Sequence, residues 1–241
     1  MTDRLKLRIL QLYPNDMNIY GDRGNLLALD RRLRQHGFEP EIINHNVGDK
    51  FNKDVDIIIG GGGQDSGQEK IQEDLKHISN KLKILAENGT PMLVICGMYQ
   101  LFGNQFITSQ SKTIEGIGIL NVETIAGDER LIGNIKITSD KFGDIIGYEN
   151  HSGQTYLGEN TEPLGYVTLG EGNNLHDKSE GALYKNIIGT YLHGSLLPKN
   201  PRITDFLIQQ AAINRYGKFI PAEIDDSLIE KARISAMSRP R

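Results

Sequence analysis

The only cysteine in this 241-residue chain has the neighbours that a nucleophile requires. It follows four consecutive apolar residues, Met92–Ile95, which predict a strand buried on both faces. Gly97 allows a sharp reversal, and residues 98–102 read as the start of a helix. A strand, a tight turn and a helix form a nucleophile elbow, in which a thiol at Cys96 would favour its reactive thiolate. A buried structural cysteine is the competing interpretation.

A run of four glycines at residues 60–63 follows another predicted strand and could bind developing negative charge. Glycines leave backbone N–H groups unshielded, so these groups can donate hydrogen bonds to an oxyanion. Nucleotide-binding loops do not fit, because no Gly-Lys-Ser/Thr follows and the dinucleotide pattern fails in every register, ending on Ser66 when it starts at Gly61. An oxyanion-hole loop and a plain tight turn remain, and the nearby elbow favours the oxyanion-hole loop.

A cysteine nucleophile needs a base, and the chain offers six histidines. His36 and His77 fall on predicted amphipathic helices among charged residues, where we expect them to be solvated. Two others fall at a short strand end and in a polar stretch. His193 follows a late predicted strand, and the carboxyl ends of neighbouring strands are where sites form in open α/β sheets. We therefore predict His193 as the base, with His151 as the runner-up.

These residues need a sheet that brings several strand ends together. The first hundred residues alternate apolar strand patterns with amphipathic helix patterns, in the order strand, helix, strand, strand, helix, strand, helix. That order predicts an α/β fold with a mostly parallel sheet covered by helices on both faces. The strands are expected at residues 5–13, 41–47, 55–59 and 92–95, and the helices near residues 26–33, 71–85 and 98–102.

The second half of the chain has a different pattern of apolar residues. Residues 113–192 hold short apolar segments and many glycines but no long helical pattern, which predicts antiparallel strands and hairpins extending or flanking the sheet. The clearest late strand covers residues 187–192, and a helix is expected over about residues 203–216.

The end of the chain is treated as a separate tail. We expect one domain over residues 1–222 and a C-terminal tail over residues 223–241. The tail carries Ile224, Leu228 and Ala232 at helical spacing, so it could be a partner-docking helix or a frayed terminus.

Composition narrows the class of protein. There are 27 basic and 31 acidic residues, and Lys and Arg are scattered, which argues against a nucleic-acid interface. One cysteine excludes an intrachain disulfide and a multi-cysteine metal site. The N-terminus has no apolar signal region, and no stretch approaches the roughly 20 apolar residues of a membrane span. We therefore expect a soluble cytoplasmic protein.

Three motifs resemble those of class I glutamine amidotransferases. Cys96-Gly97-Met98-Tyr99-Gln100 matches the Cys-Gly-x-x-Gln core, and residues 60–65 and 189–194 match the glycine loop and the histidine segment. The resemblance implies a flavodoxin-like fold and an amidotransferase activity. Common members carry His-x-Glu, whereas Ser195 stands two residues after His193 here. That departure fits the cobyric-acid-synthase-like branch, in which a Cys–His pair lacks the third carboxylate.

Within that branch, the chain is most similar to the GatD-type glutaminase subunits of lipid II isoglutaminyl synthases. The shared features run along nearly the whole chain, at residues 20–25, 130–133, 148–151, 172–174 and 192–194. One difference is Met98, where such proteins usually have a second glycine. We expect Met98 to alter the size of the pocket.

The resemblance implies a cysteine-thioester mechanism acting on L-glutamine. Cys96 would attack the side-chain carboxamide, and His193 would move the protons. The N–H groups of Gly97 and Gly62 would hold the oxyanion.

Three further residues are assigned to substrate binding through the resemblance. Arg130 matches the family position that binds glutamine, and a guanidinium suits a carboxylate. Gln100 would line the pocket or cap the turn, and Asn150 belongs to the motif at residues 148–151.

The resemblance also implies a division of labour between two chains. We expect no cofactor or metal in this chain, with ATP and metal confined to a Mur-ligase-like partner that amidates the D-glutamate of lipid II. The missing synthetase domain and the missing acid after His193 predict a heterodimer, in which the partner could supply the orienting carboxylate. The competing hypotheses are a cobyric-acid-type amidotransferase, a cysteine peptidase or deglycase of the related superfamily, and a non-catalytic regulatory subunit.

Overall fold

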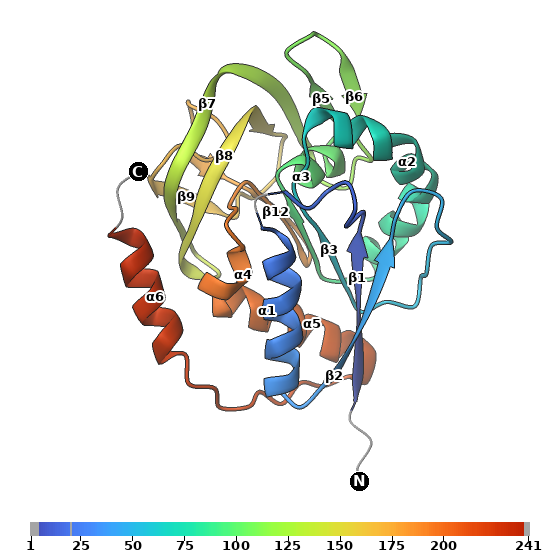
Figure 1. Ribbon diagram of the computed structural model, residues 1–241, viewed down its shortest axis with the longest axis vertical. Helices are drawn as coiled ribbons and strands as arrows, with labels where there is room; N and C mark the ends of the chain where they lie inside the picture. Colours follow the sequence, from blue (N-terminus) through green and yellow to red (C-terminus); the bar gives the residue numbers. More distant parts are fainter. Residues whose placement is uncertain (1–4, 20, 239–241) are drawn as a thin grey trace.

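Two sheets of six strands each organise the protein, and Figure 1 shows them side by side. The computed structural model describes residues 5–19 and 21–238. Tyr20 and residues 239–241, which belong to the predicted motif and tail, lie outside the described residues. The strands are β1 (Lys6–Leu12), β2 (Glu39–His45), β3 (Ile57–Gly60), β4 (Met92–Ile95), β5 (Gln105–Ile107), β6 (Thr113–Glu115), β7 (Val122–Ser139), β8 (Gly143–Leu157), β9 (Gly165–Leu169), β10 (Ser179–Glu180), β11 (Ala182–Tyr184) and β12 (Ile187–Thr190). The helices are α1 (Arg23–Gln35), α2 (Asp65–Glu87), α3 (Gly97–Phe102), α4 (Leu196–Lys199), α5 (Pro201–Tyr216) and α6 (Ser227–Met237).

The first sheet positions the chemistry. Its strand order is β11-β12-β4-β3-β1-β2, and all neighbours are parallel except β11 and β12. Gly60 is paired with Val94 and Thr190 with Ile95, so β3, β4 and β12 end at the same level. The segments that follow these three strands therefore emerge together at one edge. This confirms the predicted mostly parallel α/β fold.

Amphipathic helices cover this sheet. On α2 the buried apolar residues recur every three or four positions, at Ile71, Leu75, Ile78 and Leu82, as one helical face requires. α5 begins with Pro201 in its first turn and ends at a left-handed Gly217, and α1 contacts α5. Figure 1 shows α1 and α5 on one side of the sheet, away from α2 and α3.

The second sheet has the order β10-β9-β7-β5-β6, with β8 paired to β7. β7 and β8 form an antiparallel hairpin of 18 and 15 residues, longer than the short segments expected from the sequence. The strands predicted to extend the parallel sheet mostly form this separate sheet, and only β11 and β12 join the first one.

The C-terminal tail contains a helix, α6, and none of its residues is buried. The guanidinium of Arg233 attaches it to the body by donating to the Asn200 side chain and the Asp144 backbone oxygen, and Asp226 pairs with Arg32. Within the tail, residues 227–237 are helical, and whether this helix docks a partner stays a prediction. No helix in the described residues is long and apolar enough to cross a membrane.

Candidate active site

Cys96 stands at a strained turn between β4 and α3. Its backbone has φ 52° and ψ −111°, a conformation that non-glycine residues rarely adopt. The backbone is fixed on both sides, because Cys96 N donates to Thr190 O at 2.9 Å and its carbonyl accepts from Gln100 N at 3.0 Å. The residue is only 6% exposed, yet it lines a cavity of about 350 Å³, which is large enough for an amino acid.

The glycine loop approaches the elbow too closely for side chains. A Cβ at Gly97 would lie 3.0 Å from the carbonyl oxygen of Gly63, and one at Gly62 would lie 2.8 Å from the His193 ring. Small residues are therefore required on both sides of the sulfur.

The prediction that Gly62 donates to the oxyanion is wrong in this structure. Its N–H donates to the buried Asp22 carboxylate at 2.6 Å, and Gly62 does not line the cavity. The next residue, Gly63, lines the cavity with Cys96, and its nitrogen lies 3.1 Å from the Cβ position of Gly97. The geometry therefore favours Gly63 as the loop donor, opposite Gly97 in the first turn of α3, where N–H groups lack helical acceptors.

His193 lies directly behind the sulfur, as the end of β12 predicts. Its side chain is fully buried, and its backbone exchanges two hydrogen bonds with Tyr148 of β8. Burial lowers the pKa of His193, but the neighbouring Cys96 thiolate and hydrogen bonds to Asp22 and Cys96 outweigh it and raise that pKa well above its ordinary value. This environment suits an imidazolium paired with a thiolate.

Asp22 contacts both His193 and the glycine loop, and the sequence analysis did not single it out. Its Oδ1 lies 3.4 Å from His193 Nδ1, while Oδ2 accepts from Gly62. Because a pair so far apart in the sequence meets only in the folded chain, no local pattern could reveal it. The available signal was its place in the motif at residues 20–25, which the resemblance marked without giving Asp22 a role.

His151, the runner-up base, lies in the cavity wall but is unsuited to proton transfer. Burial lowers its pKa to about 3, helped by the nearby charge of His193. Its ring stacks on Tyr191 with centroids 3.6 Å apart, and Nδ1 is 2.8 Å from the Gly153 carbonyl oxygen. A histidine that stays neutral can accept hydrogen bonds in the pocket, but it cannot donate a proton to leaving ammonia.

The expectation that His36 is solvated is also wrong. Its side chain is 2% exposed, because Asp205 and Phe219 from the C-terminal part of the chain cover it. His77 is exposed, as expected.

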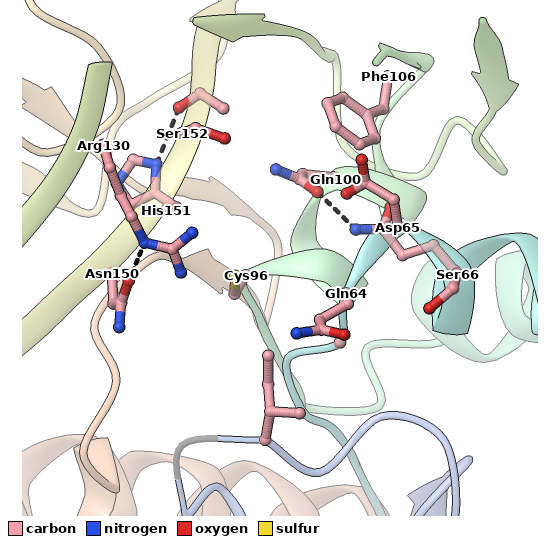
Figure 2. Close-up of a pocket in the computed structure, with 14 residues that line it drawn as sticks. Gln64, Asp65, Ser66, Cys96, Gln100, Phe106, Arg130, Asn150, His151 and Ser152 are labelled. Carbon is pink, nitrogen blue, oxygen red and sulfur yellow. Dashed lines mark hydrogen bonds between the residues drawn. The ribbon is translucent and has the colours of Figure 1, made fainter. Parts of the chain in front are cut away.

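Arg130 reaches the cavity because β7 bulges beside it. Ala126 pairs with Gly153 and Leu131 with His151, so residues 127–130 of β7 stand opposite Ser152 alone. The bulge carries Arg130 out over the pocket, where its Nε donates to Asn150 Oδ1 at 2.6 Å. Figure 2 shows Arg130, Asn150 and His151 on one side of Cys96 and Gln64, Asp65 and Ser66 on the other.

Gln100 lines the pocket, which decides between its two predicted roles. Its amide oxygen accepts from Gln68 Nε2 at 2.9 Å, and its nitrogen donates to the Tyr191 hydroxyl at 3.0 Å. Tyr191 is in turn 2.6 Å from the Thr155 hydroxyl. This buried network joins α2, α3, β8 and the segment before His193.

Glu180 holds the segment before His193 by accepting hydrogen bonds from it. It is fully buried and accepts from Tyr191 N at 2.6 Å and from the Thr190 hydroxyl. Burial raises its pKa to about 8, despite these hydrogen bonds. Nothing in its sequence neighbourhood distinguishes it from a surface glutamate of a hairpin.

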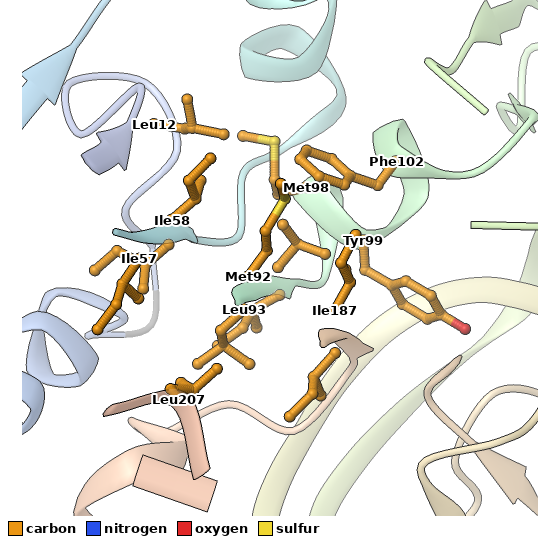
Figure 3. Close-up of a cluster of buried hydrophobic side chains, with 14 of the residues drawn as sticks. Leu12, Ile57, Ile58, Met92, Leu93, Met98, Tyr99, Phe102, Ile187 and Leu207 are labelled. Atoms are coloured by element: carbon orange, nitrogen blue, oxygen red, sulfur yellow. The ribbon is translucent and has the colours of Figure 1, made fainter. Parts of the chain in front are cut away.

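Met98 does not line the pocket, so any effect on its size would act through the glycine loop that Met98 supports. Figure 3 shows it among buried apolar side chains of β1, β3 and α3, and it is 0% exposed. Its Cγ lies 2.6 Å from where a Cβ on Gly60 would be, so it fills the space beneath the glycine loop. In the described part of the chain, no group of three or more His, Cys, Asp or Glu side chains could hold a metal ion.

Comparison of the chain with known proteins shows the family to which it belongs. Residues 8–201 match the model of the CobB/CobQ-like glutamine amidotransferase domain. In solved structures, the fold is similar to that of PurLQS from Thermotoga maritima, with a TM-score of 0.61 and 15% identity over 85% of this chain and 98% of that one.

Proteins similar in sequence show to which branch of this family the chain belongs. The lipid II isoglutaminyl synthase (glutamine-hydrolyzing) subunit GatD of Staphylococcus aureus is 41% identical over 97% of this chain and 99% of its own. The subunit of the same name from Streptococcus pneumoniae is 37% identical over 89% of this chain and 84% of its own. Cobyric acid synthase of Listeria innocua is 32% identical over 58% of this chain but only 28% of its own length. This chain therefore belongs to the CobB/CobQ-like glutamine amidotransferase family, in the branch of the GatD-type glutamine-hydrolysing subunits.

Proposed function

We propose that this subunit hydrolyses L-glutamine through a γ-glutamyl thioester on Cys96. The observation that supports this most is the arrangement at the sheet edge, where the sulfur opens on an amino-acid-sized cavity with His193 behind it and Arg130 across from it. The α-carboxylate of glutamine would bind Arg130, which leaves the side-chain carboxamide to reach Cys96.

The first half of the reaction breaks the amide. The thiolate of Cys96 attacks the carboxamide carbon, and the N–H groups of Gly97 and Gly63 stabilise the oxyanion. His193 then donates its proton to the nitrogen as the C–N bond breaks, which releases ammonia and leaves the thioester. In the second half, His193 takes a proton from water as the water attacks the thioester, and glutamate leaves.

The ammonia requires a second active site. The GatD relatives are named as subunits of a lipid II isoglutaminyl synthase, which implies a partner. We propose that the partner of this chain is a Mur-ligase-like protein that uses ATP and metal to activate the D-glutamate carboxylate of lipid II in the cytoplasm. No cofactor is then needed in this chain.

A cobyric-acid-type amidotransferase is the second candidate, because it would use the same chemistry on another acceptor. The matching cobyric acid synthase argues against it, since the similarity covers only 28% of that longer protein, whereas it covers 99% and 84% of the two GatD relatives.

The test is an ammonia-release assay on L-glutamine, with and without a co-expressed Mur-ligase-like protein. Wild type should release ammonia, and Cys96→Ala should lose more than about a thousandfold because the covalent route is removed. Equal ammonia release by wild type and Cys96→Ala would contradict the proposal, and acceptor assays with lipid II and with a cobyrinic acid separate the two candidates.

A further inference from the structure

Asp22 is a buried carboxylate that contacts the proposed base and the glycine loop at once. We propose that Asp22 is the positioning residue of the Cys96–His193 pair and sets both the orientation of the imidazole and the direction of the loop. The proposal rests on the proposed glutaminase function, and it places within this chain the orienting carboxylate that the partner was expected to be able to supply.

The position of Asp22 in the fold shows that its carboxylate is committed to the site. It stands at the N-cap of α1, where aspartate ordinarily accepts from the first helical N–H groups, but its side chain makes no such bond. Instead, the two oxygens face His193 Nδ1 at 3.4 Å and Gly62 N at 2.6 Å. The side chains of Asp22 and His193 are 3% and 0% exposed, so water does not compete for these contacts.

The contact with Nδ1 determines what the other ring nitrogen does. A carboxylate beside Nδ1 holds the proton there and leaves Nε2 for the sulfur of Cys96. It also stabilises the imidazolium that accompanies a thiolate. The 3.4 Å separation is long for a hydrogen bond, and contacts of this kind commonly tighten when substrate binds.

The contact with Gly62 determines which loop donor faces the substrate. Because Asp22 takes the N–H of Gly62 into the protein, the following N–H of Gly63 is the one placed beside the cavity. One carboxylate therefore connects the base to the oxyanion loop.

The residues around Asp22 contact the segment that follows His193. Ser195 donates to Gly21 O at 2.7 Å, and Leu197 N donates to Asn25 Oδ1 at 2.9 Å. A Cβ at Gly24 would lie 2.1 Å from the Ser195 hydroxyl. The motif at residues 20–25 is thus explained, over its described part, as the support that brings Asp22 to His193.

The other ionisable groups around His193 do not fit the orienting role. Glu180 is engaged by Thr190 and Tyr191, and burial raises its pKa to about 8, which keeps it protonated at neutral pH. His151 is held neutral by its lowered pKa.

Glu149 and Ser195 are also committed elsewhere. Glu149 accepts from the backbone N–H groups of Glu171 and Gly172. Ser195, at the position of the usual family acid, carries no charge and bonds to Gly21. Asp22 is therefore the carboxylate we assign to His193.

The test compares Asp22→Asn with Asp74→Asn in the protein co-purified with its partner subunit. Asp74 is a matched control, because it makes a similar contact with His45 at 3.0 Å away from the cavity. The single cysteine makes alkylation by iodoacetamide specific to Cys96, so its rate against pH reports the thiolate.

Asp22→Asn should lower the alkylation rate near pH 6 by about tenfold or more, because the imidazolium that sustains the thiolate is lost. It should lower kcat for glutamine by about 100-fold or more, with KM changed by less than about threefold, because Asp22 does not line the cavity. Asp74→Asn should leave both the profile and kcat unchanged. In the His193→Gln background, Asp22→Asn should add little, since both changes remove the same effect.

A wild-type alkylation profile and kcat in Asp22→Asn would overturn the proposal, as would losses that add fully to those of His193→Gln. Should Asp22→Asn not fold, Asp22→Ser offers the same comparison, since a hydroxyl can still accept from Gly62 without the charge. If wild type shows no glutaminase activity, the proposed function fails. The alkylation profile still tests Asp22 in that case, so the two failures are distinguishable.

Discussion

At the residue scale, a few side chains carry all the proposed chemistry, and each is supplied by a different element. Cys96 comes from the β4–α3 turn, His193 from the segment after β12, and Arg130 from the bulge in β7. Because each is held by neighbouring backbone or side-chain hydrogen bonds, the roles of nucleophile, base and carboxylate binder can be separated by mutation.

Arg130→Gln should raise KM for glutamine by about 100-fold and change kcat much less. A guanidinium that binds the α-carboxylate contributes equally to ground-state and transition-state binding, so its loss appears mainly in KM. Steady-state glutaminase kinetics measure this. Arg34→Gln is the control, because Arg34 pairs with Asp30 on the exposed surface of α1. An unchanged KM in Arg130→Gln would remove Arg130 from the substrate site.

Sequence reasoning found residues that a local pattern marks and missed those that only tertiary contacts define. The apolar run before Cys96 and the late strand before His193 both point to a strand end. Asp22 is 171 residues from His193 in the chain, and nothing local indicates their contact. The sequence also could not distinguish Gly62 from Gly63 as the oxyanion donor. The carboxylate that accepts from the N–H of Gly62 comes from another part of the chain.

At the scale of elements, α3 and the glycine loop pack as a unit around Met98. A side chain at Gly60 would clash with Met98, and Met98 is fully buried beneath the loop. The element that supports the sulfur therefore depends on apolar packing as well as on hydrogen bonds.

Met98→Ala should lower the free energy of unfolding by about 2–4 kcal/mol, because it leaves a cavity in a close-packed core. KM should stay within about twofold, since Met98 does not line the pocket. Denaturant unfolding and glutaminase kinetics check both values, with Met237→Ala on the partly exposed α6 as the control. A changed KM at unchanged stability would show that Met98 shapes the pocket after all.

The free energy of unfolding of Glu180→Gln should increase relative to that of wild type as pH rises. Burial raises the pKa of Glu180 to about 8, well above the ordinary carboxyl value, so the folded state binds a proton that the unfolded chain has already released. Wild type therefore loses stability between about pH 5 and about pH 8, and glutamine, which does not titrate, removes that loss.

The measurement is the difference in free energy of unfolding between Glu180→Gln and wild type at about pH 5 and about pH 9. The exposed Glu159→Gln is the control. A difference that stays constant with pH, or falls as pH rises, would contradict the assignment of a raised pKa to Glu180.

The sequence predicted most elements of the first sheet and its helices, because each shows a period of two, a period of 3.6 residues or an unbroken apolar run. It did not predict the length of β7 and β8. Glycines and polar residues interrupt their apolar pattern, notably at the bulge of residues 127–130, so one long hairpin reads as several short strands.

At the scale of the whole molecule, the site lies where the two sheets meet. The parallel sheet provides the sulfur and the base, while the long hairpin of the second sheet closes the cavity and carries Arg130. The tail forms a helix that contacts α4 but exposes apolar side chains, including Leu228 at 77% and Ile234 at 70%. We propose this tail as a docking element for the partner subunit.

Changing Leu228 and Ile234 together to aspartate should weaken co-purification with the partner by about tenfold or more, because an apolar contact would be replaced by buried charge. The melting temperature of the isolated chain should not fall, since both side chains are exposed there. Pull-down titration and thermal unfolding measure the two effects. Unchanged binding by the double variant would exclude the outer face of α6 from the interface.

The central claim is that Cys96 forms a covalent bond with the substrate, and intact-protein mass spectrometry after rapid acid quench with L-glutamine tests it most directly. The account predicts an added γ-glutamyl group on wild type and none on Cys96→Ala. It should accumulate in His193→Gln if attack still occurs but water is no longer activated. Steady glutamine turnover by wild type with no trapped adduct in any of the three proteins, or an adduct that persists in Cys96→Ala, would contradict the account.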